Sequence, residues 1–498
     1  MQLARQIAHS LSANPNEVAI EFQGREITWR EIKNVADAIS SALDRADVPR
    51  QVSVGWLATN HPSMAAAAAA LAKSERCISP VNPHLPPLTL TDELRKVRFH
   101  AVIGVPADWK IAGLVEACRE AGSVAIVVDW AGQEAVVGYI PGLERLGPGP
   151  HREPMPDVAL ERLSSGTTGT PKRIPVTHAN LLRAIAIVAP SSGAADPPDA
   201  DVRLFYTPFS HAGGIWGLIG VLFNGRRLVL FEKFNVDEWV KAVKKYKPVS
   251  AGLVPTMLKM VVDANVAPED IASIKSVRTS TAPLDPKLQE LFEARYGIPI
   301  LGDYGATEFI GGVAGWSLQS HRKYGELKRG SVGRAQRDVS LQIIDAETKE
   351  ELPHGGIGLL RVKSPRWGED WITTTDLASI DDDGFVFLHG RADEAIIRGG
   401  FKVLPEKVCE VLRLHPAVRD VGMLAVKDER LGQVPVAVIE PYPGAHVAAE
   451  ELDRHAREHL PSYQVPVAFE FVDALPRTPS LKVSRPELKK MFAQKYEL

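Results

Sequence analysis

Short apolar runs alternate with helix-like stretches through the first third of this 498-residue chain. The runs 52–57, 101–105 and 124–128 are mostly apolar, as in strands that are buried on both faces. Between them lie 30–43, whose apolar residues recur near the helical period, and 111–121, which is also helix-like. This alternation is typical of a largely parallel sheet covered by helices, so we predict an α/β fold.

The pattern changes in the second half of the chain. From residue 330 onward, short β-rich runs are broken by Asp/Gly turns. The last hundred residues indicate a small α+β unit, with helices predicted over 405–414 and 449–459 and strands over 420–426 and 434–439. We place the boundary near 392–394 and expect a domain of residues 1–392 followed by one of residues 393–498.

Composition excludes several classes of protein. The 58 Lys and Arg residues nearly balance the 61 Asp and Glu residues, whereas a generic nucleic-acid binder would carry a basic excess. The most apolar run, 64–72, is mostly alanine and is shorter than the ~20 residues that span a membrane. Residues 1–11 lack the apolar core of a signal peptide. We therefore expect a cytoplasmic protein without a transmembrane segment.

Cysteine usage points the same way. Cys77, Cys118 and Cys409 lie far apart in the sequence, with no Cys-x-x-Cys pair and no Cys/His cluster. We predict three buried, reduced thiols rather than a disulfide framework or a structural zinc site.

A glycine- and hydroxyl-rich segment, 164–172, carries the most chemical information. Its small residues let backbone N–H groups approach an anion closely, its hydroxyls can donate hydrogen bonds, and Lys172 can add a positive charge. These features suit a polyphosphate. The segment is not a Walker A loop, because Pro171 precedes the lysine. Taken alone, a plain surface loop would have the same composition, so that alternative stays open.

The segment resembles the phosphate loop of the adenylate-forming superfamily, which includes acyl-CoA synthetases, firefly luciferase and the adenylation domains of peptide synthetases. Six further segments resemble motifs of that family in the same order, namely 208–214, 282–284, 304–308, 374–376, 390–393 and 476–482. Each motif alone is weak or moderate evidence. Their joint order covers roughly residues 25 to 485, nearly the whole chain.

The resemblance implies a fold and a reaction. The fold would be a large N-terminal domain of helix-covered sheets plus a distorted β-barrel, with a small mobile α+β C-terminal domain. The reaction would join ATP and a carboxylic acid into an acyl-adenylate, and coenzyme A would then displace AMP. Joining two anions at phosphorus requires charge neutralisation more than a nucleophilic side chain.

The resemblance also implies nucleotide-binding residues. The phosphates would be held by Ser164, Ser165, Gly166, Thr167, Thr168, Gly169 and Lys172. The adenine side would be formed by Thr281, Ala282, Pro283, Asp303, Tyr304 and Gly305. Asp376 would accept hydrogen bonds from the ribose hydroxyls and Arg391 would donate to the ribose. The family usually has glycine where this chain has Ser280, Thr281 and Thr375.

Four residues are the candidates for catalysis. Lys482 would bridge the carboxylate and the α-phosphate, although the family usually has glycine where Leu481 precedes it. Thr307 would hydrogen-bond the α-phosphate, and Glu308 would hold Mg²⁺. His211 would stand at the entrance for the carboxylate, although a lone histidine is more often a packed or surface residue.

The remaining assignments concern the acid, coenzyme A and domain movement. The acyl pocket would be lined by His211, Gly213, Gly214, Phe309, Ile310 and Gly311, whereas Trp216 could belong to the core. Gly399 and Gly400 would let the thiol arm approach the backbone, although they could also form a plain β-turn. Asp393 would be the hinge about which the C-terminal domain rotates between the two half-reactions.

Two other functions remain open from the sequence. The adenylate could pass to a carrier protein or an amine instead of coenzyme A. Alternatively, the replaced glycines could mark a nucleotide-binding protein that has lost catalysis, although Lys172, Glu308, Asp376, Arg391 and Lys482 are all present. We expect a small carboxylic acid and coenzyme A as partners and no nucleic acid. The sequence does not identify the acid, and it leaves open a homodimer of the kind common among relatives.

Overall fold

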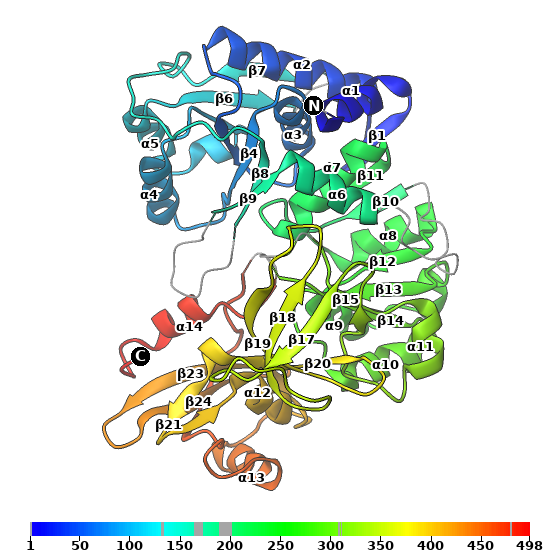
Figure 1. Ribbon diagram of the computed structural model, residues 1–498, viewed down its shortest axis with the longest axis vertical. Coiled ribbons are helices and arrows are strands. Elements are labelled where there is room, and N and C mark those ends of the chain that lie inside the picture. Colours follow the sequence, from blue (N-terminus) through cyan, green and yellow to red (C-terminus); the bar gives the residue numbers. More distant parts are fainter. Residues whose placement is uncertain are drawn as a thin grey trace. The chain divides into compact units, whose positions relative to one another are not determined.

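The structure of the protein is a computed structural model that describes residues 2–130, 134–163, 173–188, 202–306, 309, 311–478 and 481–498 (Figure 1). The chain divides into two compact units. The first unit comprises Met1–Gly252, Met260–Val277 and Ala306–Gly311. The second unit comprises Leu253–Lys259, Arg278–Gly305 and Gly312–Leu498.

A seven-stranded sheet forms the centre of the first unit, in the order β7-β6-β5-β3-β4-β8-β9. Strands β6, β5, β3, β4 and β8 pair in parallel, and β7 and β9 close the two edges in antiparallel fashion. The bounds are β3 Ser53–Leu57, β4 Cys77–Val81, β5 Ala101–Gly104, β6 Val124–Asp129, β7 Val136–Tyr139, β8 Val158–Leu163 and β9 Arg173–Thr177. The predicted runs 52–57, 101–105 and 124–128 are confirmed as β3, β5 and β6.

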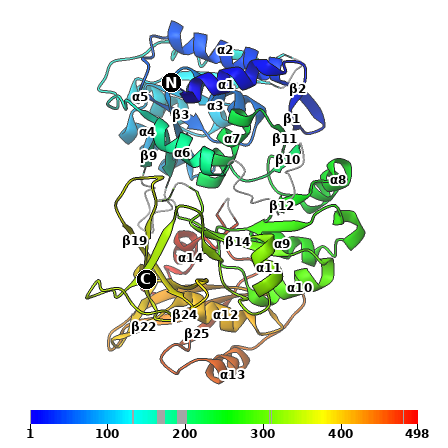
Figure 2. The ribbon, with the colours of Figure 1, turned by 45° about the vertical axis from the view of Figure 1, so that its right-hand side comes forward.

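Helices cover both faces of this sheet (Figure 2). Alternate strand residues such as Ala101 and Ile103 pack with α1, α2 and α3, whereas Val102 between them packs with α4 and α5. The bounds are α1 Gln2–Ala13, α2 Trp29–Arg45, α3 Pro62–Lys73, α4 Pro87–Val97 and α5 Leu114–Ala121. Because both faces are covered, the strands must be apolar throughout, which explains the continuous apolar runs in the sequence.

The alanine run folds as α3, whose small side chains let the helix pack within the core of the first unit. Every residue from Pro62 to Ala72 is buried, so this helix has no solvent-facing side. A helix that is apolar all round belongs in a protein core. The neighbouring helix α2 starts with a reciprocal cap, in which Glu31 N–H donates to Thr28 Oγ1 at 3.3 Å and Thr28 N–H donates to the Glu31 carboxylate at 2.7 Å.

A second sheet in the first unit has the order β10-β11-β1-β2. Its bounds are β1 Val18–Phe22, β2 Arg25–Thr28, β10 Val202–Phe205 and β11 Arg227–Leu230. Further helices are α6 His178–Val188, α7 Ala212–Asn224 and α8 Val236–Tyr246.

A five-stranded sheet follows in the order β12-β13-β14-β15-β16. Its bounds are β12 Ser250–Gly252, β13 Ser276–Thr279, β14 Ile300–Tyr304, β15 Ala314–Gly315 and β16 Arg334–Ala335, with helices α9 Pro255–Asp263, α10 Pro286–Tyr296 and α11 Leu318–Tyr324.

Antiparallel strands take over where the sequence changes character. The four strands β17 Ser340–Ile344, β18 Gly358–Lys363, β19 Ile372–Ile380 and β20 Val386–Arg391 form a sheet in chain order. An isolated bridge pairs Arg334 with Phe385. The distorted β-barrel that the resemblance implied for the N-terminal domain stays a prediction.

The C-terminal residues build their own sheet, β22-β21-β24-β23, with β25 parallel to β24. The strands are β21 Ile396–Arg398, β22 Phe401–Val403, β23 Val418–Asp428, β24 Gly432–Pro441 and β25 Ala468–Phe471, and the helices are α12 Pro405–Arg413, α13 Ala449–His459 and α14 Arg485–Phe492. The predicted helix over 449–459 is confirmed, and the two predicted strands lie within β23 and β24. The proposed domain boundary falls in the short 3₁₀ turn Ala392–Glu394 and stays a prediction.

One predicted helix begins later than the sequence suggested. The helix predicted over 111–121 is α5, which starts at Leu114, because Gly113 adopts a left-handed backbone with φ +77°. The three cysteines are confirmed as free and buried. Within the described ranges, no helix is both long and apolar enough to cross a membrane.

Candidate active site

Several predicted site residues fall outside the described ranges. They are the phosphate-loop residues Ser164, Ser165, Gly166, Thr167, Thr168, Gly169 and Lys172, together with Thr307, Glu308 and Ile310. The strands on either side of the phosphate loop are described. Leu163, at the end of β8, pairs in antiparallel register with Arg173, at the start of β9, so the two ends of the loop lie side by side.

A buried ion network anchors the base of that loop. The Arg152 guanidinium donates to both oxygens of Glu161 at 2.6 Å, and the side chain of Glu161 is fully buried. Arg173 lies 3.7 Å from Glu161 and also pairs with Glu93. Burial alone would raise the pKa of Glu161, but hydrogen bonds from Arg152 and Ser79 hold it below its usual value. The network links β8 to β9 through Glu161 and Arg173, and it links β9 to α4 through Arg173 and Glu93.

The two predicted ribose-binding residues face each other across two strands. Asp376 on β19 pairs with Arg391 on β20 in the antiparallel register. The Tyr304 hydroxyl, at the end of β14, donates to Asp376 Oδ2. Arg391 donates to Thr375 Oγ1 at 2.8 Å and to both oxygens of Asp393 at 3.0 and 2.8 Å. The structure therefore joins the ribose motif, the tyrosine motif and the predicted hinge in one hydrogen-bonded group.

Tyr304 is held more firmly by the protein than the sequence implied. The Tyr304 side chain is 8% exposed, so most of its ring is covered by protein. Its hydroxyl orients the Asp376 carboxylate, a role the sequence did not suggest. Thr375, where the family has glycine, lies within β19, and extended backbone suits a β-branched residue. Gly305 follows Tyr304 directly at the end of β14.

Asp303 is a carboxylate held in an unfavourable place for charge. Burial raises the pKa of Asp303 to about 6, against the lowering effects of Arg278, Gln336 and Arg366. Gln336 Nε2 donates to its Oδ1 at 2.7 Å. An added Cβ at Gly312 would lie 2.4 Å from the same oxygen, so a larger residue there would displace the Asp303 and Gln336 side chains.

The adenine-side segment has a strained backbone. Thr281 has φ +82°, in the left-handed region that β-branched residues rarely adopt. The family usually has glycine at this position, and the backbone here takes a glycine-like conformation although the residue is threonine. Thr281 and Pro283 are exposed and Ala282 is half-buried. Strain of this kind clusters at functional sites, where surrounding structure maintains it.

Lys482 directly precedes Val483, which forms an isolated antiparallel bridge with Arg477. Thr478 N–H donates to the Lys482 carbonyl at 2.8 Å, and Leu481 has φ +64°. The Leu481 carbonyl accepts a hydrogen bond from Thr256 Oγ1 at 3.1 Å. Leucine therefore adopts the left-handed conformation for which the family uses glycine.

The charges of two glutamates and of the ribose pair all act on the pKa of the predicted catalytic lysine. The protein atoms around the ammonium lower the pKa of Lys482, Glu394 and Glu406 act in the opposite direction, and Arg391 and Asp376 are also close enough to contribute. Arg485, the first residue of α14, pairs with Glu394 at 2.8 Å and with Glu406 at 3.3 Å. The lysine, the ribose pair and the predicted hinge all belong to the second unit.

The predicted acid segment lies in the first unit, where its helix begins. His211 is the N-cap residue of α7, with φ −90° and ψ 150°. An added Cβ at Gly214 would lie 1.9 Å from the Pro208 carbonyl oxygen, whereas one at Gly213 would lie 3.9 Å from Thr207 Cγ2. The space beside Gly214 is therefore filled by backbone, and its place in the acyl pocket stays a prediction. Trp216 packs against the main core, as the alternative for that residue held.

Two buried polar residues position these segments. Asn60 Nδ2 donates to the carbonyl of Thr207 at 3.2 Å, and its Oδ1 accepts from Phe209 N–H at 2.8 Å. Arg162 donates to the carbonyl of Phe309, a residue whose side chain is 1% exposed. Gly311 has φ +97°, so the chain turns sharply there. Neither Asn60 nor Arg162 was predictable from the sequence, because neither belongs to a local motif and both act on segments far along the chain.

Gly399 and Gly400 form the turn between β21 and β22. Both have positive φ, +57° and +87°, and the flanking Arg398 and Phe401 are paired, which defines a two-residue hairpin turn. Gly399 N–H donates to the Leu431 carbonyl at 2.7 Å. A Cβ at Gly400 would meet no atom within 4 Å. Gly399 and Gly400 therefore form the β-turn that was the alternative interpretation. Their role in binding coenzyme A stays a prediction.

Comparison with protein families assigns the class. The model of AMP-binding enzymes matches residues 7–368, and the model of the AMP-binding enzyme C-terminal domain matches residues 407–482. The protein therefore belongs to the AMP-binding enzyme family, the adenylate-forming superfamily that its motifs resemble.

Particular relatives are ligases. The chain is 29% identical over 365 residues to 4-coumarate–CoA ligase from Pinus taeda. The alignment covers 68% of this chain and 66% of that relative. It is 26% identical over 520 aligned residues to indoleacetate–CoA ligase from Aromatoleum aromaticum. The alignment covers 99% of each chain.

Solved structures share the fold. ATP-bound MatB from Rhodopseudomonas palustris matches with a TM-score of 0.82 at 22% identity, covering 99% of this chain and 100% of the other. The amide bond synthetase McbA from Marinactinospora thermotolerans matches with a TM-score of 0.79 at 22% identity, covering 98% of this chain and 100% of the other. These similarities confirm the expected fold class, with a large N-terminal and a small C-terminal domain.

Proposed function

We propose that the protein is an AMP-forming carboxylic acid–CoA ligase that uses ATP. The observation that carries the proposal is the hydrogen-bonded group around the ribose pair Asp376 and Arg391, which lies in the same unit as Lys482. A lysine charge acting at a nucleoside site is what adenylation requires. Membership of the AMP-binding family and the names of the relatives support it.

In the first half-reaction, an oxygen of the acid attacks the α-phosphorus of ATP and pyrophosphate leaves. Lys482 would stabilise the negative charge shared by the carboxylate and the α-phosphate. Asp376 would accept hydrogen bonds from the ribose hydroxyls. A carboxylate has about four acceptor sites, so the Tyr304 hydroxyl orients Asp376 without exhausting it.

In the second half-reaction, the sulfur of coenzyme A attacks the acyl carbon, AMP leaves with the phosphate oxygen, and the thiol proton passes to solvent. The products are an acyl-CoA thioester and AMP. Gly399 and Gly400 would admit the thiol arm, and Asp393 would be the residue about which the C-terminal domain rotates. The pairing of Arg391 with Asp393 supports that role, because it links the ribose site to the hinge.

A magnesium ion would neutralise phosphate charge during adenylation, and Glu308 would be its protein ligand. Glu308 lies outside the described residues, so the proposal depends on its residue type alone.

The glycine replacements favour an active enzyme over one that has lost catalysis. Thr281 and Leu481 both keep positive φ, +82° and +64°. The backbone shapes that glycine would supply are therefore retained at both positions, at a cost of about 1–2 kcal/mol each.

The test is AMP release with ATP, Mg²⁺ and a panel of aromatic, alicyclic and aliphatic acids, each with and without coenzyme A. The proposal expects release that requires both an acid and coenzyme A. AMP release that requires an acid and an amine or carrier protein, but not coenzyme A, would contradict coenzyme A as the acceptor of the acyl group. ATP binding with no AMP release for any acid would contradict the ligase.

A further inference from the structure

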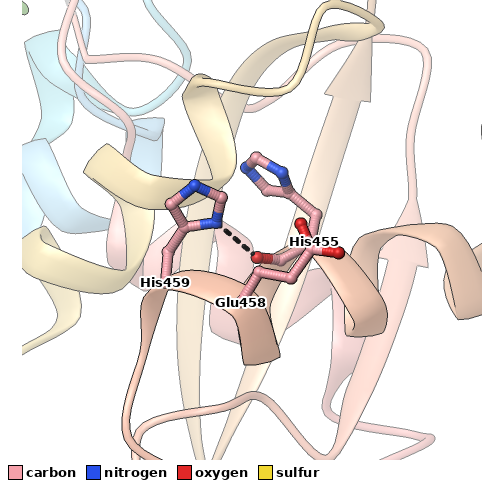
Figure 3. A group of neighbouring side chains, drawn as sticks. All are labelled: His455, Glu458 and His459. Atoms are coloured by element: carbon pink, nitrogen blue, oxygen red, sulfur yellow. Dashed lines mark hydrogen bonds between the residues drawn. The ribbon is translucent and has the colours of Figure 1, made fainter.

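The end of helix α13 gathers two imidazoles and a carboxylate. His455, Glu458 and His459 each offer one ligand atom, and these atoms all lie within 4.8 Å of one another (Figure 3). The two histidines are four residues apart on the helix, a spacing that places both rings on one side. Glu458 and His459 are exposed and His455 is half-buried, so a dissolved ion can reach the group.

Hydrogen bonds define which nitrogen of each ring is available. His455 Nε2 lies 3.0 Å from the Val411 carbonyl oxygen, and His459 Nδ1 lies 2.8 Å from the His455 carbonyl oxygen, the contact drawn in Figure 3. A carbonyl oxygen only accepts, so these two nitrogens carry the hydrogens. In a neutral imidazole the opposite nitrogen then has a lone pair, which is Nδ1 of His455 and Nε2 of His459. Metal-binding histidines in proteins typically donate their other N–H to a carbonyl in this way.

We propose that His455, Glu458 and His459 bind a divalent first-row transition metal ion, with Zn²⁺ as the reference ion. Two imidazole nitrogens and one carboxylate oxygen are a known ligand set for zinc. Ligand atoms around one tetrahedral zinc ion lie about 3.3 Å apart, given bond lengths of about 2.0–2.1 Å. Bringing the three ligand atoms to this spacing requires rotations of the side chains, and Glu458 and His459 are exposed at a helix end where such rotations are possible.

The neighbouring histidine is excluded as a ligand. His415 packs edge-on against the His455 ring, with centroids 5.3 Å apart. Its Nδ1 accepts from Ala417 N–H at 3.3 Å and its Nε2 lies 3.2 Å from the Glu451 carboxylate, so both nitrogens are engaged. His415 therefore supports the His455 ring and leaves the ion to the other three residues.

Local charge favours a cation. Residues 449–459 contain four carboxylates and two arginines. Arg457 lies next to Glu458, but its guanidinium makes two hydrogen bonds with Asp453, at 2.6 and 3.0 Å. That pairing neutralises the charge of Arg457. Imidazole ligands select transition metals over Mg²⁺, which prefers oxygen ligands in octahedral geometry.

The experiment titrates ZnCl₂ into the full-length, tag-free protein by calorimetry, in buffer that contains Mg²⁺ so that sites for that ion are already filled. CoCl₂ serves as a second probe, because its visible absorption reports low-coordinate binding to nitrogen. We expect one Zn²⁺ per chain. His459→Gln should weaken binding at least about tenfold. The matched control is His446→Gln, which changes an exposed histidine of the same C-terminal region outside the group.

A second variant keeps the result independent of folding. Glu458→Gln changes an exposed side chain, keeps its size and should also weaken Zn²⁺ binding, while thermal unfolding without metal should match that of the unaltered protein. The proposal is overturned if His459→Gln and His446→Gln bind Zn²⁺ equally well, or if the unaltered protein takes up no Zn²⁺. Neither outcome depends on the ligase assay, so this site and the proposed function are tested separately.

Discussion

The ribose pair in the second unit and the turn before α7 in the first unit are built by opposite means. Asp376 and Arg391 face each other on paired strands, and their side chains take part in a network of charges and hydrogen bonds. The turn 208–214 is shaped by backbone contact, with Gly214 against the Pro208 carbonyl and Asn60 bonded to main-chain groups. In the first region side chains can change while the fold remains, whereas in the second a single methyl group should disturb the fold.

The largest effect is expected at Lys482. Lys482→Ala should slow acyl-adenylate formation by about 10²–10³-fold, because it removes a preorganised charge at the reacting phosphate. Conversion of a supplied acyl-adenylate and coenzyme A should be much less affected. Pyrophosphate exchange and single-turnover thioester formation measure the two halves. Lys489→Ala, an exposed lysine on α14, is the matched control, and equal loss in both halves would contradict the role of Lys482.

Gly214→Ala should come next, and its effect should be on folding. A methyl group 1.9 Å from a carbonyl oxygen forces the turn or α7 to move, which we expect to cost about 3 kcal/mol or more of unfolding free energy. Gly213→Ala has 3.9 Å of clearance and should cost less than about 1 kcal/mol. Denaturant unfolding of both variants measures the difference. Similar stabilities would remove the contrast between the two regions.

Asp376→Asn should affect nucleotide binding and leave the fold intact. Hydrogen bonds to a charged group are worth about 1.5–3 kcal/mol, so we expect KM for ATP to rise about 10- to 100-fold. Thermal unfolding should change little, since the backbone pairing of β19 with β20 does not require the charge. Asp370→Asn, at an exposed position before β19, is the control. A large loss of stability would place Asp376 with the residues that maintain the fold.

Asp303→Asn should have the smallest effect, and a stabilising one. Because burial raises the pKa of Asp303 to about 6 from an ordinary value near 3.8, the folded state holds a proton more tightly than the unfolded chain does. The carboxylate therefore weakens the fold as pH rises from about 4 to 6 and above. Removing its charge should add about 1–2 kcal/mol at pH 8 and little at pH 4. Unfolding measured at both pH values checks this, and stabilisation confined to pH 4 would contradict it.

The contrast between the two regions also explains what sequence analysis found and missed. The ribose residues were predictable because each lies in a short motif, Thr374-Thr375-Asp376 or Gly390-Arg391-Ala392-Asp393. The role of Gly214 was not predictable. Its Cβ direction meets Pro208 only because the turn folds back, and Asn60, which holds that turn, precedes it by about 150 residues.

Tertiary structure also decided how the hinge and lysine are surrounded. Glu394 and Glu406 carry no recognisable pattern, yet their charges act on the pKa of Lys482, and both pair with Arg485. Helix α5 starts later than predicted because Gly113 adopts a left-handed backbone. The sequence shows the glycine, but it does not show which backbone conformation the glycine adopts.

The amino-acid sequence by itself determined the alternation of strands and helices, the all-apolar α3 and the ordered motifs, because these depend on neighbouring residues and on periods of two or 3.6 residues. The tertiary structure alone decided which distant groups meet: Tyr304 with Asp376, Arg162 with the Phe309 carbonyl, and the charges around Lys482. Such contacts depend on how whole elements pack, and packing responds to the volume and charge of many residues at once.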